Sequence, residues 1–264
     1  TGNNNNGADY QGSMADFLML VIVDKTENTY SFLQFNRDTM TEVALIDHNG
    51  EGEATANIQL CTAHWYGGNR EQSCENTVKS VKKLLGGIQI DGYYELNMSE
   101  IPKLNNMVDG VTVTLEDDFS KKYPKMKKGA TINLDDEQAY AYVHDRYGVG
   151  DEENTSRMKR QQQYMTGFFK KLQEKVKANP NYANEVFESL QDVSTTDITI
   201  GKISNISNIF ASGTDKGIFE LAGKSKIGQA LGDEIDHMEF YVNKKAMVST
   251  MSELFGIVEQ KNKE

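Results

Sequence analysis

Three arginines and a glutamine fall within one short stretch of the chain, on either side of a glycine-containing acidic loop. They are Arg146, Arg157, Arg160 and Gln161. A guanidinium group is planar and permanently charged, so it suits a phosphate or a carboxylate. Several arginines together can hold a pyrophosphate and neutralise the charge that develops as a bridging oxygen leaves. The alternative interpretation is that these arginines contact only water and neighbouring acids, as most surface arginines do.

Two further segments place charged side chains beside predicted strands. Arg37 and Asp38 directly follow a strand predicted over 30–35, where open α/β sheets usually bind ligands. Arg37 could hold an anionic oxygen, and Asp38 could orient it, bind a metal or accept a proton. Asp16 directly precedes the apolar run 17–23, where a carboxylate could hold Mg²⁺ together with substrate phosphates. The alternatives are a local Arg–Asp pair that fixes a turn and, for Asp16, an ordinary turn residue.

A long helix is predicted from Thr155 to roughly Lys177, and its periodicity positions part of this chemistry. Apolar residues recur at the i, i+3, i+4, i+7 spacing of a buried helical face. They are Met165, Phe168, Phe169, Leu172 and Val176. Continued towards the N-terminus, the same stripe reaches Gln161 and Arg157. The helix is therefore expected to bury its later turns and to present an amide and a guanidinium at its start.

The rest of the chain predicts an α/β sandwich, with a central mixed sheet and helices on both faces, as one domain over residues 1–264. The apolar run 17–23 is typical of a strand covered on both faces and should pair with 30–35 as a hairpin. Residues 58–65 are expected to be helical. A short helix through Ala141 should lead into a strand end that carries His144 and Arg146. Strands alternate with helices throughout, which favours this fold class.

Composition excludes some classes of function. The 264 residues carry a net charge of −11, and 38% of them are hydrophobic. An acidic chain without a basic stripe or a recognition-helix motif argues against a nucleic-acid partner and a DNA-binding regulator. No apolar run is long enough to cross a bilayer. The two cysteines, Cys61 and Cys74, could form one disulfide or remain two buried thiols. His64 lies near them, but the spacing matches no zinc motif.

The order of several blocks resembles the LytR-CpsA-Psr family, from about residue 15 to about residue 175. The blocks are A-D-F-L-M-L-V, S-F-L-Q-F-N-R-D-T, H-W-Y-G-G, N-T-V-K-S-V-K-K-L-L-G-G-I-Q-I-D-G-Y-Y-E-L-N, M-V-D-G-V-T-V, A-Y-A-Y-V-H-D-R-Y and S-R-M-K-R-Q-Q-Q. The resemblance implies an extracellular enzyme, anchored by an N-terminal transmembrane helix outside this chain. It implies transfer of a glycopolymer phosphate from a polyprenyl-pyrophosphate carrier to peptidoglycan, with Mg²⁺ or Mn²⁺, and it allows a pyrophosphatase activity. The lipid would lie in a long apolar tunnel beside Arg37 and Arg146.

The resemblance also implies roles for single residues. Asp16 would be the metal ligand. Arg37, Asp38, Arg146, Arg157 and Gln161 would form the catalytic group, with the arginines clamping the pyrophosphate. Substrate-binding roles fall to His144, Arg160 and Gln59.

Three departures from the family pattern weaken the expected basic pocket. Met14, His144 and Gln59 stand where the family has an arginine, an arginine and a lysine. Histidine is neutral for much of the time near neutral pH. A second hypothesis therefore stays open: a non-catalytic module that binds a polyprenyl phosphate or a wall polymer and has lost the chemistry.

Overall fold

A mixed three-stranded sheet lies at the centre of the computed structural model, which describes residue 10 and residues 12–256. Its strand order is β1 (Leu18–Asp24), β2 (Thr29–Phe35) and β9 (Thr214–Glu220). β1 and β2 pair as an antiparallel hairpin, and β9 runs parallel to β2. The predicted hairpin is confirmed, and β2, with a strand on each side, is buried along nearly its whole length.

One face of the sheet packs on α4 (Asn154–Ala178) and α6 (Ile200–Ser212). Successive side chains of a strand alternate between its two faces. On this face the ring of Phe32 stacks on that of Phe169 from α4, with ring centroids 4.1 Å apart. The periodic apolar stripe of the sequence therefore forms the contact that was expected of it.

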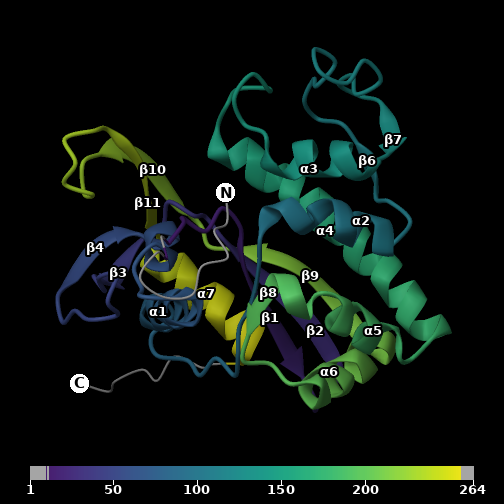
Figure 1. The fold of residues 1–264 in the computed structure, drawn as a ribbon, viewed down its shortest axis with the longest axis horizontal. Helices are drawn as coiled ribbons and strands as arrows, with labels where there is room; N and C mark the ends of the chain where they lie inside the picture. The colour runs from purple at the N-terminus through teal and green to yellow at the C-terminus, as the bar shows by residue number, and fades with distance from the viewer. Residues whose placement is uncertain (1–9, 11, 257–264) are drawn as a thin grey trace.

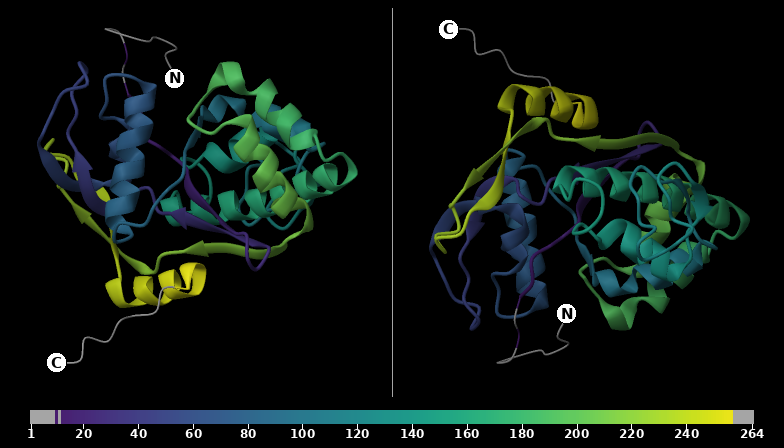
Figure 2. Two further views of the ribbon diagram at one scale, coloured as in Figure 1. Left: turned by 90° about the horizontal axis from the view of Figure 1, so that it is seen from below. Right: turned by 90° about the horizontal axis from the view of Figure 1, so that it is seen from above.

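The opposite face packs on α1 (Arg70–Leu84) and α7 (Lys244–Phe255). Leu33 and Phe35 of β2 are buried there in a cluster that includes residues of both helices. Figures 1 and 2 show α7 on one side of β9 and the helical group that contains α4 and α6 on the other. The predicted architecture, with helices on both faces of a mixed sheet, is confirmed.

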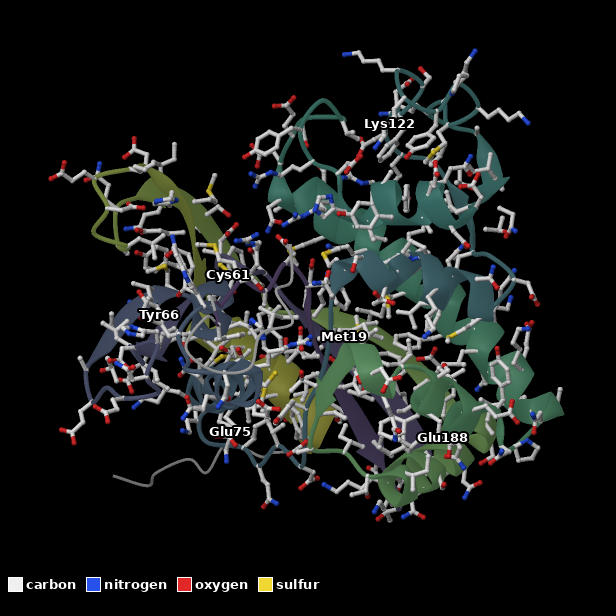
Figure 3. The ribbon with its side chains drawn as sticks, in the orientation of Figure 1. Met19, Cys61, Tyr66, Glu75, Lys122 and Glu188 are labelled. Atoms are coloured by element: carbon white, nitrogen blue, oxygen red, sulfur yellow. The ribbon has the colours of Figure 1, made fainter. Side chains whose placement is uncertain are left out.

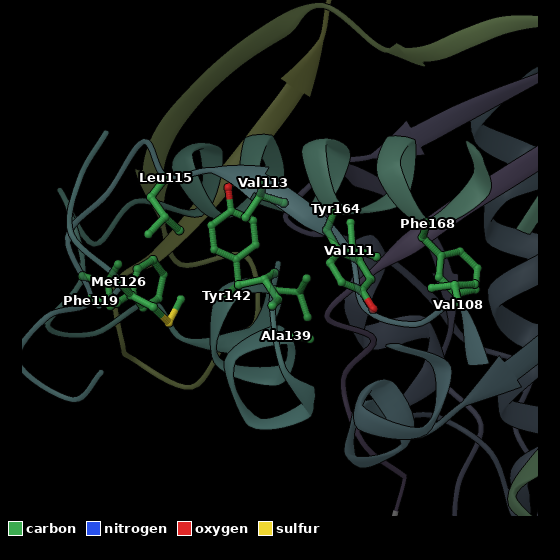
Figure 4. Packing of buried hydrophobic residues seen from close by; sticks show 13 residues of the cluster. Val108, Val111, Val113, Leu115, Phe119, Met126, Ala139, Tyr142, Tyr164 and Phe168 are labelled. Atoms are coloured by element: carbon green, nitrogen blue, oxygen red, sulfur yellow. The ribbon is translucent and has the colours of Figure 1, made fainter. Parts of the chain in front are cut away.

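A second core lies among α2 (Ile101–Met107), α3 (Asp136–His144) and α4. Figure 4 shows its packing. Its largest fully buried members include Tyr142, Tyr164 and Met126. This core holds the N-terminal half of α4 against α3, so the two elements that carry the predicted phosphate-binding residues are fixed relative to each other.

His144 ends a helix and does not lie on a strand, so that part of the prediction is wrong. Asp135 and Gln138 form a capping box at the start of α3, with each side chain hydrogen-bonded to the backbone of the other residue. A capping box stabilises the first helical turn. The helix then continues to His144, three residues beyond the predicted end at Ala141.

β1 also differs from the predicted strand covered on both faces, because it lies at the edge of its sheet and is partly exposed. Its pairing places Val21 opposite Phe32 and Met19 opposite Gln34, on the face that packs against α4. Val21 is 51% exposed. A continuous apolar run indicates that both faces of a strand are apolar, but it does not show that other elements cover them.

The remaining elements complete the fold around these layers. The predicted helix over 58–65 is instead the end of β4 followed by a 3₁₀ helix. None of the helices in the part of the chain that the structure describes has the length and hydropathy needed to cross a membrane. The elements not yet named are β3 (Met40–Ala44), β4 (Thr55–Gln59), η1 (Leu60–His64), β5 (Tyr94–Leu96), η2 (Met98–Glu100), β6 (Thr112–Thr114), β7 (Thr131–Asn133), α5 (Tyr182–Ser189), η3 (Gln191–Val193), β8 (Ser194–Thr196), β10 (Gly223–Gly228) and β11 (His237–Val242).

Candidate active site

The carboxylate of Asp16 lies between two arginines that are distant in the sequence. Its Oδ1 accepts a hydrogen bond from Nη1 of Arg37 and lies 3.2 Å from Nη1 of Arg157. The Arg157 side chain is only 6% exposed. Desolvation by burial lowers the pKa of Arg157, although Asp16 opposes this effect and the nearby Arg37 adds to it. Two largely buried cations therefore share one carboxylate, which leaves the region able to accept further negative charge.

A chain of hydrogen bonds connects the end of β2 to the start of α4. The Oδ1 of Asn36 accepts from the backbone N–H of Asp38 at 2.9 Å and from Nδ2 of Asn154 at 3.1 Å. The Oδ1 of Asn154 in turn accepts from Nη2 of Arg157 at 2.9 Å. These two buried asparagines set the position of Arg157 relative to the loop after β2. The sequence analysis assigned no role to either asparagine.

Asp38 is a buried carboxylate that retains an unpaired oxygen. Its Oδ1 lies 3.6 Å from Nε of Arg37, and its Oδ2 is buried without a hydrogen-bond partner. Burial raises the pKa of Asp38, while the charges of Arg37, Arg157 and Arg146 oppose that rise. The Nε atoms of Arg37 and Arg157 are also buried without partners. Buried polar groups are normally hydrogen-bonded, so a polar ligand or water would satisfy these three atoms.

Arg146 lies just beyond α3, on the side of Asp38 and Arg157. Its guanidinium packs over the ring of Tyr147 at 4.6 Å, and its charge lowers the pKa of both Asp38 and Arg157. The structure thus brings Arg37, Arg146 and Arg157 to one region. His144 lies on the rim, where its ring stacks on Tyr140 at 4.7 Å and its side chain is 40% exposed.

Three other candidate residues are held by contacts within the protein. Arg160 donates to the carbonyls of Tyr142 and Asp145 and to Asp117, and its side chain is 2% exposed. We therefore assign Arg160 to the support of the site and not to substrate contact.

The two candidate glutamines are likewise buried and bonded. Gln161 accepts from Gln34 at 3.2 Å and donates to the carbonyl of Val143 at 3.1 Å, which joins β2 to α3. Gln59 donates to the carbonyl of Met238 at 3.2 Å. Gln161 and Gln59 therefore position the strands and helices around the arginines, and any contact that they make with a ligand is still a prediction.

Two sulfur atoms lie within contact distance of Nη2, the second terminal nitrogen of Arg37. Its Nη2 lies 3.0 Å from Sδ of Met14 and 3.3 Å from Sγ of Cys61. Both cysteines are buried free thiols and not a disulfide, and burial raises the pKa of Cys61 and that of Cys74, the latter to about 12.

The two carboxylates of the site fit a magnesium ion. Asp16 and Asp38 lie close enough that the charge of Asp16 raises the pKa of Asp38. Asp38 has the unpaired buried oxygen described above. Mg²⁺ is usually held by one or two carboxylates together with substrate phosphates and water. The two residues therefore offer the type of donor that Mg²⁺ takes, and its binding here is a prediction.

The expected tunnel beside the arginines is not confirmed. Two cavities described in the structure have volumes of about 680 and 400 Å³. The first is lined by Met14, Trp65 and Tyr66 among others, and the second by residues near β8. Neither is lined by Arg37 or Arg146. A partly exposed apolar face, with Met19 and Val21, lies on β1, which begins two residues after Asp16.

Comparison with known proteins gives a consistent result. The model of the LytR_cpsA_psr family matches residues 4–255. A Bacillus cereus (strain AH820) protein, polyisoprenyl-teichoic acid–peptidoglycan teichoic acid transferase TagU, is 29% identical over 168 residues, which are 62% of this chain and 50% of that protein. The chain thus spans about half the length of the curated relative that it matches.

Solved structures share the fold. B. subtilis TagV has a TM-score of 0.70 and 20% identity, over 97% of this chain and 95% of that one. TagT bound to LIIa-WTA has a TM-score of 0.66 and 20% identity, over 92% and 85%. The protein gbs0355 from Streptococcus agalactiae has a TM-score of 0.73 and 20% identity, over 96% and 82%. At these identities the likeness establishes the fold.

Proposed function

Because this chain belongs to the LytR_cpsA_psr family, we propose that it transfers a glycopolymer phosphate from a polyprenyl-pyrophosphate carrier to peptidoglycan. The curated relative is described as a transferase that moves teichoic acid from a polyisoprenyl carrier to peptidoglycan. The observation that carries the proposal is the pair of buried arginines, Arg37 and Arg157, that share Asp16 and whose Nε atoms make no hydrogen bond within the protein. A pyrophosphate offers the oxygens that such donors lack.

In this proposal each side chain has a distinct task. Arg37, Arg146 and Arg157 bind the pyrophosphate and stabilise the charge on the oxygen that leaves. Asp38, whose pKa is raised by burial, accepts the proton of the acceptor hydroxyl. The hydroxyl oxygen forms a bond to the phosphorus of the glycopolymer phosphate, and the bond from that phosphorus to the bridging oxygen breaks. The polyprenyl phosphate leaves with the electron pair.

Asp16 would hold Mg²⁺, which leaves Asp38 to accept the proton. When bound, the ion would supply Lewis acidity to a phosphoryl oxygen. Asp16 would also keep the two guanidinium groups close together before substrate binds, which reduces the reorganisation needed in the reaction.

The apolar face of β1 supports a lipid carrier. Met19 and Val21 lie on one face of β1, and β1 begins two residues after Asp16. Figure 3 shows Met19 near the centre of the molecule. Val21 is 51% exposed and Met19 is partly exposed, so this face offers some apolar surface to a ligand. A prenyl chain on this face would have its pyrophosphate at the arginines. We further propose that the protein works on the extracellular face of the membrane through an anchor outside this chain.

A second candidate function is supported by the contacts of Arg37. Its Nη2 contacts the sulfur atoms of Met14 and Cys61 and not an anion. His144, which is 40% exposed, takes the position where the family has an arginine. A site with fewer cations can bind a polyprenyl phosphate without turning it over. Release of polyprenyl phosphate separates the two functions, because a binding module leaves the pyrophosphate donor intact.

The test uses a synthetic polyprenyl-pyrophosphate-linked glycan, an acceptor and Mg²⁺, with release of polyprenyl phosphate as the measured product. Arg157→Gln removes a charge that faces the developing negative charge, and such losses typically lower kcat by about 10²–10³. The matched control is Lys159→Gln, which removes a cation from an exposed position of the same helix. Equal turnover in wild type and Arg157→Gln would contradict the proposed role, and donor binding without any product would favour the second function.

A further inference from the structure

Three side chains with metal-binding atoms meet at a place that the proposed reaction does not use. They are His64 at the end of η1, Cys74 on α1 and Glu95 on β5. One ligand atom from each lies within 4.8 Å of those of the other two, and they form the single group of this kind in residues 10 and 12–256. His64 and Cys74 are buried, with 8% and 4% exposure. Residues from three separate elements thus converge inside the fold.

The surroundings of two of these residues orient their ligand atoms towards the group. Nδ1 of His64 lies 2.9 Å from the carbonyl of Ser13, so this nitrogen carries the proton and donates. Nε2, on the Cys74 side, is then left with its lone pair. The Oε2 of Glu95 accepts from Nη2 of Arg70 at 2.5 Å. Histidines and carboxylates that bind metals are commonly held by such outer contacts.

The separation of the His64 and Cys74 ligand atoms is close to that of two ligands on one ion, and the ligand atoms of all three residues lie within 4.8 Å of one another. Nε2 of His64 and Sγ of Cys74 are 3.9 Å apart, at the far limit for a hydrogen bond to sulfur. With bond lengths of about 2.3 Å to sulfur and about 2.0–2.1 Å to nitrogen, a tetrahedral zinc ion separates the two ligand atoms by about 3.6 Å. A shift of a few tenths of an ångström closes the difference.

We propose that His64, Cys74 and Glu95 form a binding site for Zn²⁺. A thiolate, an imidazole and a carboxylate are the donors that zinc takes in proteins, whereas Mg²⁺ avoids sulfur. Three protein ligands leave the fourth tetrahedral position to water, because the Glu95 side chain is 20% exposed and gives access from solvent. The ion would fasten η1 to α1 and β5. It would use none of the residues assigned to the phosphate site, although η1 also carries Cys61, which contacts Arg37.

The experiment titrates the purified, chelator-treated chain with Co²⁺ as a spectroscopic substitute for Zn²⁺. We expect a near-ultraviolet cobalt–thiolate charge-transfer band that saturates at one equivalent and is reversed by Zn²⁺. Cys74→Ala should abolish this band, whereas Cys61→Ala, the matched control at the other buried thiol, should keep it. Because loss of an outer contact lowers metal affinity about 10–100-fold, Arg70→Gln should weaken binding by that factor and His64→Ala by at least about 100-fold.

Circular dichroism spectra recorded before each titration show that the variants are folded. Arg70→Gln keeps all three ligands, so it tests the site even where a ligand variant does not fold. The proposal is overturned by the absence of a thiolate band at stoichiometric Co²⁺. It is equally overturned by a band that persists in Cys74→Ala, or by an affinity that is unchanged in both His64→Ala and Arg70→Gln.

Discussion

Asp16→Asn tests whether one carboxylate stabilises two buried guanidinium groups. The variant keeps the size of the side chain and removes the charge shared by Arg37 and Arg157. Removing one partner of a fully buried ion pair costs about 3–5 kcal/mol, whereas surface pairs contribute about 0–1 kcal/mol. The Asp16 side chain is 28% exposed and that of Arg157 only 6%. We therefore expect a loss of about 2 kcal/mol in the free energy of unfolding, between those limits.

Urea unfolding followed by circular dichroism measures this loss, and a thermal scan should show the midpoint falling by about 4–8 °C. The matched control is Asp192→Asn, the same chemical change at an exposed position, which should stay within about 0.5 kcal/mol of wild type. A double-mutant cycle then combines Asp16→Asn with Arg157→Gln. Because these side chains are in contact, we expect a coupling energy of about 1–2 kcal/mol.

Two results would refute the reasoning. A loss below about 0.5 kcal/mol in Asp16→Asn would mean that solvent already screens the arginines. An additive cycle would mean that Asp16 and Arg157 do not interact, whatever their separation in the structure.

Three further predictions concern burial. Because burial raises the pKa of Asp38, the folded state binds a proton on this carboxylate more tightly than the unfolded state does. The stability of Asp38→Asn should therefore increase relative to that of wild type as the pH rises from about 3 to about 7. A difference in stability that does not change with pH would contradict this prediction. Cys61 and Cys74 should both resist a thiol reagent in the native chain and react in denaturant, since both are buried; rapid native labelling of either would show that it is accessible. Phe169→Ala removes the stack on Phe32 and, because Phe169 is only partly buried, should lower the unfolding free energy by about 2–3 kcal/mol in urea titrations, with Phe169→Leu as the milder control.

Local periodicity accounts for the parts of the fold that the sequence predicts well. The helix expected from Thr155 to Lys177 runs from Asn154 to Ala178 in the structure. Its apolar residues recur at helical spacing over several turns, and this spacing differs from the two-residue alternation of a strand. The hairpin of β1 and β2 follows in the same way from two apolar runs around a short polar turn.

Features that depend on distant neighbours were not predictable. The apolar run of β1 fits a central strand as well as an edge strand, and only the placement of β9 beside β2 decides between them. Residues 58–65 contain both a strand end and a 3₁₀ helix, which are too short to have a period of their own.

The site, like the fold, is predictable from the sequence only in part. The types of residue in it, arginines and aspartates beside strand and helix ends, are visible in the sequence. The proposed zinc-binding group is not visible in the sequence. His64, Cys74 and Glu95 match no spacing motif, and they meet only when η1, α1 and β5 pack together. The hydrogen bond between Asn36 and Asn154 likewise joins residues 118 positions apart.

That long-range hydrogen bond ties the arginine site to the docking of two distant segments of the chain. Until the segments around Asn36 and Asn154 dock, no partly folded chain can present Arg37 and Arg157 to the same anion. A diphosphate would therefore bind only molecules that have completed assembly, and by mass action it would draw the folding equilibrium towards them. A chain that meets its carrier soon after synthesis would gain its final increment of stability from the substrate itself.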